Sequence, residues 1–246
     1  MNIKLTIEYD GSAYHGWQIQ KNGITVQESI KRAVKKITGE DVNVIGCGRT
    51  DSGVHALNYV CNFKTSSTIP PCKFKDALNS RLPDDIRCKK SELVGENFHS
   101  SYSASAKTYM YRILNTPDTN VFERNYSWHY KYNTDIEKMR AAAQAFLGEH
   151  DFIGFAAAGF TVSTTVRTIY DIKINKENGM ITIEVTGNGF LYNMVRIIAG
   201  TLVMMGNGKI DYSIADEIIA SKDRKRAGIT APPQGLFLKE VYYGER

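Results

Sequence analysis

Residues 169–185 read Ile-Tyr-Asp-Ile-Lys-Ile-Asn-Lys-Glu-Asn-Gly-Met-Ile-Thr-Ile-Glu-Val, and they predict a β-hairpin. Two candidate strands, 169–174 and 180–185, flank Asn178-Gly179, the dipeptide that two-residue hairpin turns favour. The strands of a hairpin run antiparallel. At least part of the sheet is therefore expected to be antiparallel.

The N-terminal segment also has the pattern of a strand. Apolar residues alternate with polar ones from Ile3 to Tyr9, which predicts a strand with one buried face. Asp10-Gly11-Ser12 predicts a turn directly after it. Further strands are expected at 42–45, 56–63, 107–114 and 236–242.

Capping boxes mark two helix starts. Thr25–Glu28 and Thr134–Glu137 each precede an apolar stripe at helical spacing, and the stripes end at Gly39 and Gly148. A third helix, expected over 190–205, is apolar on most sides and should be deeply buried. Short helices are expected at 74–78 and 214–219.

The order of elements is similar in the two parts of the chain. Helices and strands interleave with hairpins, so we expect an α+β fold of two ferredoxin-like/RRM-like halves with mainly antiparallel sheets. The Ser-rich stretch 101–107 marks the boundary between the halves, 1–104 and 105–246.

Composition limits the protein class. The 246 residues include 31 Lys+Arg and 26 Asp+Glu, a net charge of +5, which permits a polyanionic partner without requiring one. With 42% hydrophobic and 11% aromatic residues the chain is not disordered. The most apolar stretch, 190–205, is too short for a membrane span and contains Asn193 and Arg196. With no secretory signal and no C-x-x-C pair, the four cysteines are expected to be reduced thiols in a cytoplasmic protein without a zinc site.

The loop 46–55, Gly-Cys-Gly-Arg-Thr-Asp-Ser-Gly-Val-His, is the most informative segment. Its glycines allow another molecule to approach the backbone, and Arg49, Asp51 and His55 can do chemistry. The spacing fits neither a phosphate-binding P-loop nor a dinucleotide fingerprint. By spacing alone, a Gly-rich hairpin with a solvated Asp51 fits as well.

Residues 48–56, Gly-Arg-Thr-Asp-Ser-Gly-Val-His-Ala, resemble the signature of the TruA-type tRNA pseudouridine synthases. The likeness continues in collinear order through 9–11, 16–18, 26–28, 82–86, 98–99, 107–113, 166–169, 189–196 and 230–236. The resemblance implies an enzyme that isomerises uridine to pseudouridine at positions 38, 39 and 40 of the tRNA anticodon stem-loop. It also implies a homodimer that grips tRNA, no metal or organic cofactor, and halves joined around a central basic active-site cleft.

The resemblance also implies roles for particular residues. Asp51 corresponds to the family's nucleophile, and Arg49 is assigned to base flipping and to clamping the RNA backbone. Tyr109 corresponds to an active-site tyrosine whose ring can stack on uracil, whereas its neighbour Tyr111 is expected to pack. Leu236 is expected in an apolar wall around the uracil, although core packing explains it nearly as well.

Arg196 is unusual because it interrupts an apolar helix, where a charge should be paired. We expect it to form an ion pair with Asp51 that keeps the carboxylate ionised and oriented. Phe190 is a second expected wall residue.

Other positions leave alternatives open. The run 222–226, Lys-Asp-Arg-Lys-Arg, is either a phosphate-contact patch or a solvated helix end. His55 and His99 could contact RNA, or the imidazole of each could find its hydrogen-bond partners within the fold. Ser101 and Ile229 stand where the family usually has arginine and proline, which suggests a divergent paralogue with narrower target choice.

Two rival functions remain. A non-catalytic RNA-binding module, such as a chaperone for tRNA folding, would also use ferredoxin-like sheets. A metal-dependent hydrolase could use Asp51 and His55.

Overall fold

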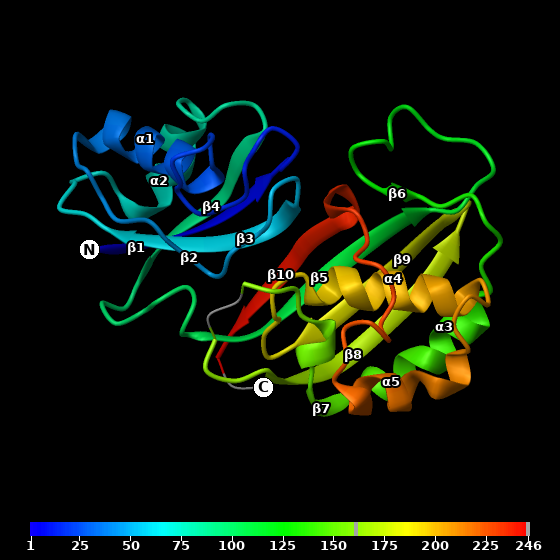
Figure 1. The fold of residues 1–246 in the computed structure, drawn as a ribbon. Helices are drawn as coiled ribbons and strands as arrows, with labels where there is room; N and C mark the ends of the chain where they lie inside the picture. Colours follow the sequence, from blue (N-terminus) through cyan, green and yellow to red (C-terminus); the bar gives the residue numbers. More distant parts are fainter. Residues whose placement is uncertain (160–161, 245–246) are drawn as a thin grey trace. The chain divides into compact units, whose positions relative to one another are not determined.

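The computed structural model describes residues 1–159 and 162–244. The chain forms two compact units (Figure 1). The first unit contains residues 1–105 and the C-terminal strand from Phe237, and the second contains Ala106–Leu236. That the halves 1–104 and 105–246 are separate domains stays a prediction.

The first unit is a sheet with helices on one face. Its strand order is β4 (Ile86–Val94), β1 (Asn2–Tyr9), β3 (His55–Lys64) and β10 (Leu236–Tyr243), with the two-residue β2 (Ile45–Gly46) also paired to β3. β1 runs antiparallel to β3 and β4, and β10 runs parallel to β3. Helices α1 (Val26–Thr38) and α2 (Phe74–Asn79) lie on one side of these strands (Figure 1).

Helix α1 begins and ends where its sequence predicts. The Thr25 hydroxyl accepts a hydrogen bond from the backbone N–H of Glu28, and Gly39 ends the helix with a φ of 79°. Val26, Ile30 and Val34 are buried on its inner face. The alternating residues of β1 are buried as predicted, namely Ile3, Leu5, Ile7 and Tyr9.

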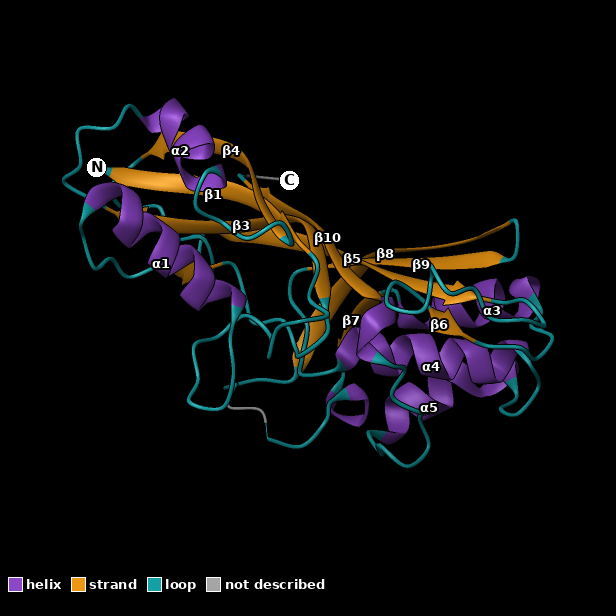
Figure 2. Ribbon diagram, turned by 90° about the horizontal axis from the view of Figure 1, so that it is seen from above, coloured by secondary structure: helices purple, strands orange, loops and turns teal. Residues whose placement is uncertain are grey.

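The second unit is an antiparallel sheet in the order β5 (Ala104–Leu114), β9 (Met180–Gly187), β8 (Val166–Glu177) and β7 (Gly148–Asp151). The short β6 (Trp128–His129) runs parallel to β5. Asn178 and Gly179 join β8 to β9 with φ angles of 49° and 79°, which confirms the predicted hairpin. Helices α3 (Ile136–Ala143), α4 (Met194–Gly206) and α5 (Ala215–Ser221) cover one face of the sheet (Figure 2).

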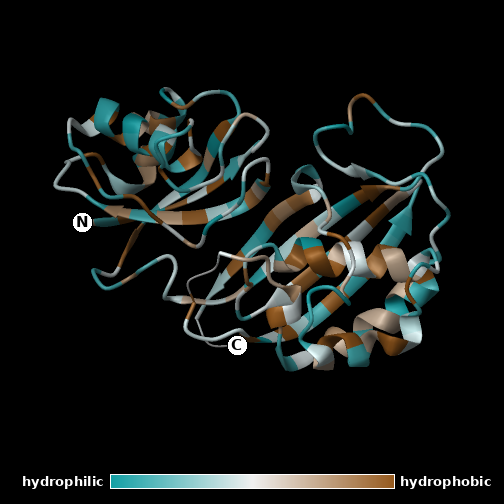
Figure 3. Ribbon diagram, in the orientation of Figure 1, coloured by the Kyte–Doolittle hydropathy of each residue, from teal (hydrophilic) through white to brown (hydrophobic). Residues whose placement is uncertain are grey.

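Helix α4 is the most apolar helix and is largely buried, as predicted (Figure 3). Within the described residues, no helix combines the length and apolarity needed to cross a bilayer.

Both units combine helices with mostly antiparallel strands, which confirms the predicted α+β class.

Several expected element bounds are wrong. α4 begins at Met194 rather than at 190, because Asn193 has a left-handed φ of 60° that interrupts helical geometry. α3 begins after an Asp135 cap, not Thr134, and its α-helical part ends at Ala143. The expected strand 42–45 is reduced to the two residues of β2.

Candidate active site

The loop between β2 and β3 is fixed at its first turn by aromatic side chains. The Tyr59 hydroxyl donates to the carbonyl of Gly48 at 2.5 Å, and Trp17 stacks on the Tyr59 ring with centroids 4.1 Å apart. A Cβ atom at Gly46 would lie 2.1 Å from the Tyr59 hydroxyl. Glycine is therefore required at Gly46 for the aromatic pair to approach the backbone.

Thr50, the residue before Asp51, is buried and anchored through both its side chain and its backbone. Its hydroxyl lies 2.8 Å from the Tyr9 hydroxyl, and its carbonyl accepts from the backbone N–H of Trp17 at 3.1 Å. The end of β1 and the loop after it therefore hold one side of Asp51.

The residues after Asp51 are anchored as well. The Ser52 hydroxyl donates to the carbonyl of Tyr14 at 3.2 Å, and the Gly53 N–H donates to the same carbonyl at 3.4 Å. The Val54 N–H donates to the carbonyl of Asp51 itself. Asp51 thus lies half-buried at a tight turn whose two flanks are both fixed.

Two glycines let the segment 10–17 approach this turn. Gly16 has a φ of 81°, and a Cβ there would lie 2.4 Å from the carbonyl oxygen of Thr50. A Cβ at Gly11 would lie 2.0 Å from the carbonyl oxygen of Val54. Since these neighbours are backbone atoms, a larger residue would displace the Asp51 turn.

Tyr14 also connects the Asp51 turn to the turn at 82–86. Its hydroxyl donates to Asp85 Oδ1 at 2.5 Å, and the backbone N–H of Asp10 donates to the carbonyl of Asp85. Burial, and then the neighbouring Asp85 carboxylate, raise the pKa of Tyr14 well above its usual value. The phenol therefore remains a hydrogen-bond donor.

The two histidines of interest are held within the fold. His55 is buried, accepts the Gly11 N–H at 3.0 Å on Nδ1 and stacks on Phe237. His99 accepts two backbone N–H groups on Nδ1, from Ser101 and Tyr102. Among the residues that the structure describes, no group of three or more His, Cys, Asp or Glu side chains is placed to hold a metal ion.

In the second unit, β5 presents two tyrosines with different surroundings. Tyr109 is half-buried, and its ring meets Phe190 edge-on with centroids 5.2 Å apart. Tyr111 is fully buried and donates its hydroxyl to the carbonyl of Pro232 at 2.7 Å, so it packs as expected. Leu236 is buried at the start of β10.

Arg196 lies in the first turn of α4 and is half-buried. Its Nε donates to the carbonyl of Ala231 at 2.7 Å, and one terminal nitrogen donates to Asn193 Oδ1 at 2.7 Å. The guanidinium therefore has a fixed orientation, set by a neighbouring loop and by the residue that begins the helix. Its ion pair with Asp51 stays a prediction.

The basic run 222–226 is largely engaged by its own unit. Lys222 pairs with Asp151 at 2.8 Å, and Arg226 lies 3.5 Å from Glu217. Arg224 donates to the carbonyl of Gly228 and to the hydroxyl of Thr230. Arg224 therefore supports the loop that leads to Ala231, the partner of Arg196.

Sequence reasoning did not find the anchoring residues Tyr9, Tyr14, Thr50 and Asp85 as a group. Tyr9, Thr50 and Asp85 lie in segments that carry the family likeness, and Tyr14 lies between two of them. Nothing in their spacing indicates that one tyrosine binds both Asp85 and the residues after Asp51.

Known proteins are similar to this chain over nearly its whole length. Residues 5–103 and 142–244 match the tRNA pseudouridine synthase family. The chain is 52% identical over 242 residues to tRNA pseudouridine synthase A of Thermoanaerobacter sp. (strain X514), covering 98% of this chain and 99% of the relative. With the same coverage, it is 55% identical to tRNA pseudouridine synthase A of Ruminiclostridium cellulolyticum and 53% identical to tRNA pseudouridine synthase A 2 of Clostridium perfringens.

Proposed function

Because the chain belongs to the tRNA pseudouridine synthase family, we propose that it isomerises uridine to pseudouridine in the anticodon stem-loop of tRNA, at positions 38, 39 and 40. The observation that carries this proposal is 55% identity to a named relative over 98% of the chain. The anchored Asp51 turn supports it, since a reactive carboxylate must be held in one geometry.

The reaction breaks the C1′–N1 glycosidic bond, rotates the uracil and joins C1′ to C5. The proton on C5 is lost and N1 gains one, so there is no net oxidation or reduction. Asp51 supplies a carboxylate that bonds transiently to the substrate, at the base or at the sugar, and divides the rearrangement into easier steps. The bonds to Thr50, Ser52 and Gly53 hold the backbone on both sides of Asp51 during these steps.

The target base must leave the helical stack before it can react, which costs a few kcal/mol. Arg49 is exposed two residues before Asp51. Its guanidinium can hold a backbone phosphate and occupy the space that the base vacates.

Tyr109 and Leu236 contact the extruded uracil in this proposal. The Tyr109 ring packs at right angles to Phe190, and an aromatic ring fixed in this way can stack on a planar base. Arg196 pairs with Asp51 and favours the ionised carboxylate. Its bonds to Ala231 and Asn193 give the guanidinium the fixed orientation that such pairing requires.

We also propose that the protein acts as a homodimer in the cytoplasm. The test is light scattering on the purified protein, with and without tRNA. A dimer mass supports the proposal, and a monomer mass under both conditions contradicts it.

The function is tested by incubating the protein with total tRNA from a strain that lacks this gene and mapping pseudouridine with carbodiimide. Wild-type protein should modify positions 38–40, and Asp51→Ala should bind tRNA without modifying it. If wild-type protein and Asp51→Ala leave the RNA in the same state, the protein is an RNA-binding module. Loss of activity in chelator would instead support the metal-dependent alternative.

A further inference from the structure

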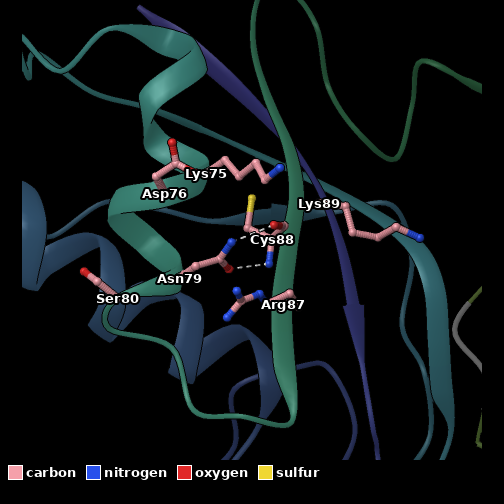
Figure 4. Close-up of a pocket in the computed structure, with 7 residues that line it drawn as sticks. All are labelled: Lys75, Asp76, Asn79, Ser80, Arg87, Cys88 and Lys89. Carbon is pink, nitrogen blue, oxygen red and sulfur yellow. Dashed lines mark hydrogen bonds between the residues drawn. The ribbon is translucent and has the colours of Figure 1, made fainter.

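The first unit has an open hollow of about 670 Å³ between α2 and β4 (Figure 4). Its lining residues come from α2, the residue that follows it and β4: Lys75, Asp76, Asn79, Ser80, Arg87, Cys88 and Lys89. None of them has a role in the function proposed above.

The floor of the hollow is fixed by Asn79. Its amide donates to the carbonyl of Cys88 at 2.9 Å and accepts the N–H of Cys88 at 2.8 Å (Figure 4). At a second point, the Ser91 hydroxyl on β4 accepts a hydrogen bond from the backbone N–H of Lys75 on α2. Because α2 is tied to the edge strand at two points, the charged side chains of the hollow project from a rigid support.

Positive charge dominates the hollow. Lys75 and Arg87 are exposed, and within ranges 1–159 and 162–244 no carboxylate lies within ion-pair distance of either. Lys89 points away from the other lining residues and binds Glu8 and Asn58 (Figure 4). Asp76 is the single carboxylate in the lining. Two cations that are not neutralised by carboxylates favour an anion here.

The hollow begins at the end of the sheet that carries the Asp51 turn. Arg87 lies opposite Glu8, and the adjoining pair is Ile86 with Tyr9, whose hydroxyl holds Thr50. On the other side of β1, Tyr9 lies opposite the start of β3. Three neighbouring strands span about 10 Å, so an RNA strand at the Asp51 turn has phosphates within reach of Arg87.

From these observations we infer that the α2–β4 hollow binds the phosphate backbone of the tRNA substrate, with Lys75 and Arg87 each contacting one phosphate. The identity of this polyanion rests on the proposed function. The site adds affinity away from the reacting base, so it affects binding of the tRNA and not the chemical step.

The test compares Lys75→Ala/Arg87→Ala with the control Lys31→Ala/Lys64→Ala, in which the cations lie outside the hollow and pair with Asp41 and Glu96. Both double variants lower the net charge by the same amount. For each protein, tRNA affinity is measured against salt concentration, and KM and kcat are measured for pseudouridine formation. Far-UV circular dichroism and melting temperature establish that both variants are folded.

Loss of two phosphate contacts should reduce the slope of log affinity against log salt by about 1.4 to 1.8. We expect KM to rise severalfold at constant kcat, with neither change in the control. Arg87→Lys should retain most of the wild-type slope because it keeps the charge. Equal slopes for the hollow double variant, the control and the wild type would overturn the inference. The binding measurement does not depend on turnover, so wild-type protein that binds tRNA with this slope but forms no pseudouridine would count against the proposed function alone.

Discussion

The hydroxyl of Tyr14 donates to Asp85 Oδ1 at 2.5 Å, while the carbonyl of the same tyrosine accepts hydrogen bonds from Ser52 and Gly53. One residue therefore ties the turn before β4 to the turn that carries Asp51. Asp85 is in turn fixed by the backbone N–H of Asp10. Through these bonds, the position of the proposed nucleophile depends on a residue more than 30 positions away in the sequence.

Replacing Tyr14 with phenylalanine removes the bond to Asp85 and leaves the ring in place. A hydrogen bond to a charged group contributes about 1.5–3 kcal/mol, and we expect the free energy of unfolding to fall by that amount. If the Asp51 turn loosens, kcat should fall about tenfold, the equivalent of about 1.4 kcal/mol, with less change in KM. Tyr212→Phe, at an exposed tyrosine, is the control and should change neither value. Wild-type kcat in Tyr14→Phe would show that this bond does not position the loop.

Gly16 and Gly39 form a matched pair, since both have positive φ angles near 80°. A Cβ at Gly39 meets open space, so Gly39→Ala should cost about 1–2 kcal/mol in backbone strain alone. Gly16→Ala adds a clash with the Thr50 carbonyl and should cost about 2–5 kcal/mol. Chemical denaturation measures both values, and only Gly16→Ala should also lose pseudouridine formation. Equal costs would contradict the close approach of residue 16 to the Asp51 turn.

Arg196→Met keeps most of the side-chain volume of Arg196 and removes its guanidinium. We expect a folded protein with little activity, because the proposed partner of Asp51 is lost. The melting temperature should also fall by a few degrees, since the bonds to Ala231 and Asn193 disappear. Asn193→Gly removes one of these bonds without removing the charge and tolerates the left-handed φ of 60° at this position, so it should retain most activity. Full turnover by Arg196→Met would refute the proposed pairing.

Cys88 should make the protein less stable at alkaline pH. Burial raises the pKa of this thiol from 9.0 to about 12. Between these values the unfolded chain is a thiolate while the folded chain keeps its proton, so stability is fully present below pH 9 and is lost as pH rises towards 12. The loss attributable to Cys88 is about 1.4 kcal/mol per pH unit. Urea denaturation of Cys88→Ala at pH 8 to 11 should show a shallower decline than the wild type, and parallel curves would contradict the raised pKa.

Arg224 and Lys225 are adjacent cations with different surroundings. Arg224→Ala loses its bonds to Gly228 and Thr230 and should destabilise the protein by about 1–3 kcal/mol. Lys225 is exposed, and Lys225→Ala should leave the melting temperature unchanged. Calorimetry separates the two variants. The same melting temperature in both would mean that the bonds of Arg224 do not stabilise the loop.

Local patterns predicted the elements whose signals lie within a few residues. The Asn178-Gly179 hairpin, the Thr25 and Gly39 caps of α1 and the alternation of β1 all depend on backbone preferences or on burial of one face. The local patterns gave wrong helix bounds where a single residue changed the backbone conformation. Asn193 shortens α4. Asp135 replaces Thr134 as the cap of α3, because Asp and Thr are both common helix caps and the sequence offers them side by side.

The sequence alone determined the α+β class, the family and the segment that carries Asp51, because each is encoded in contiguous residues. The tertiary structure decided how that segment is held. Tyr9, Tyr14 and Asp85 reach it only after β1, β3 and β4 pair in register. Lys75 and Arg87 line the same hollow only because α2 packs beside β4. Hydrogen bonds and electrostatic forces act over a few ångströms, so residues far apart in the chain can use them only after folding has brought them together.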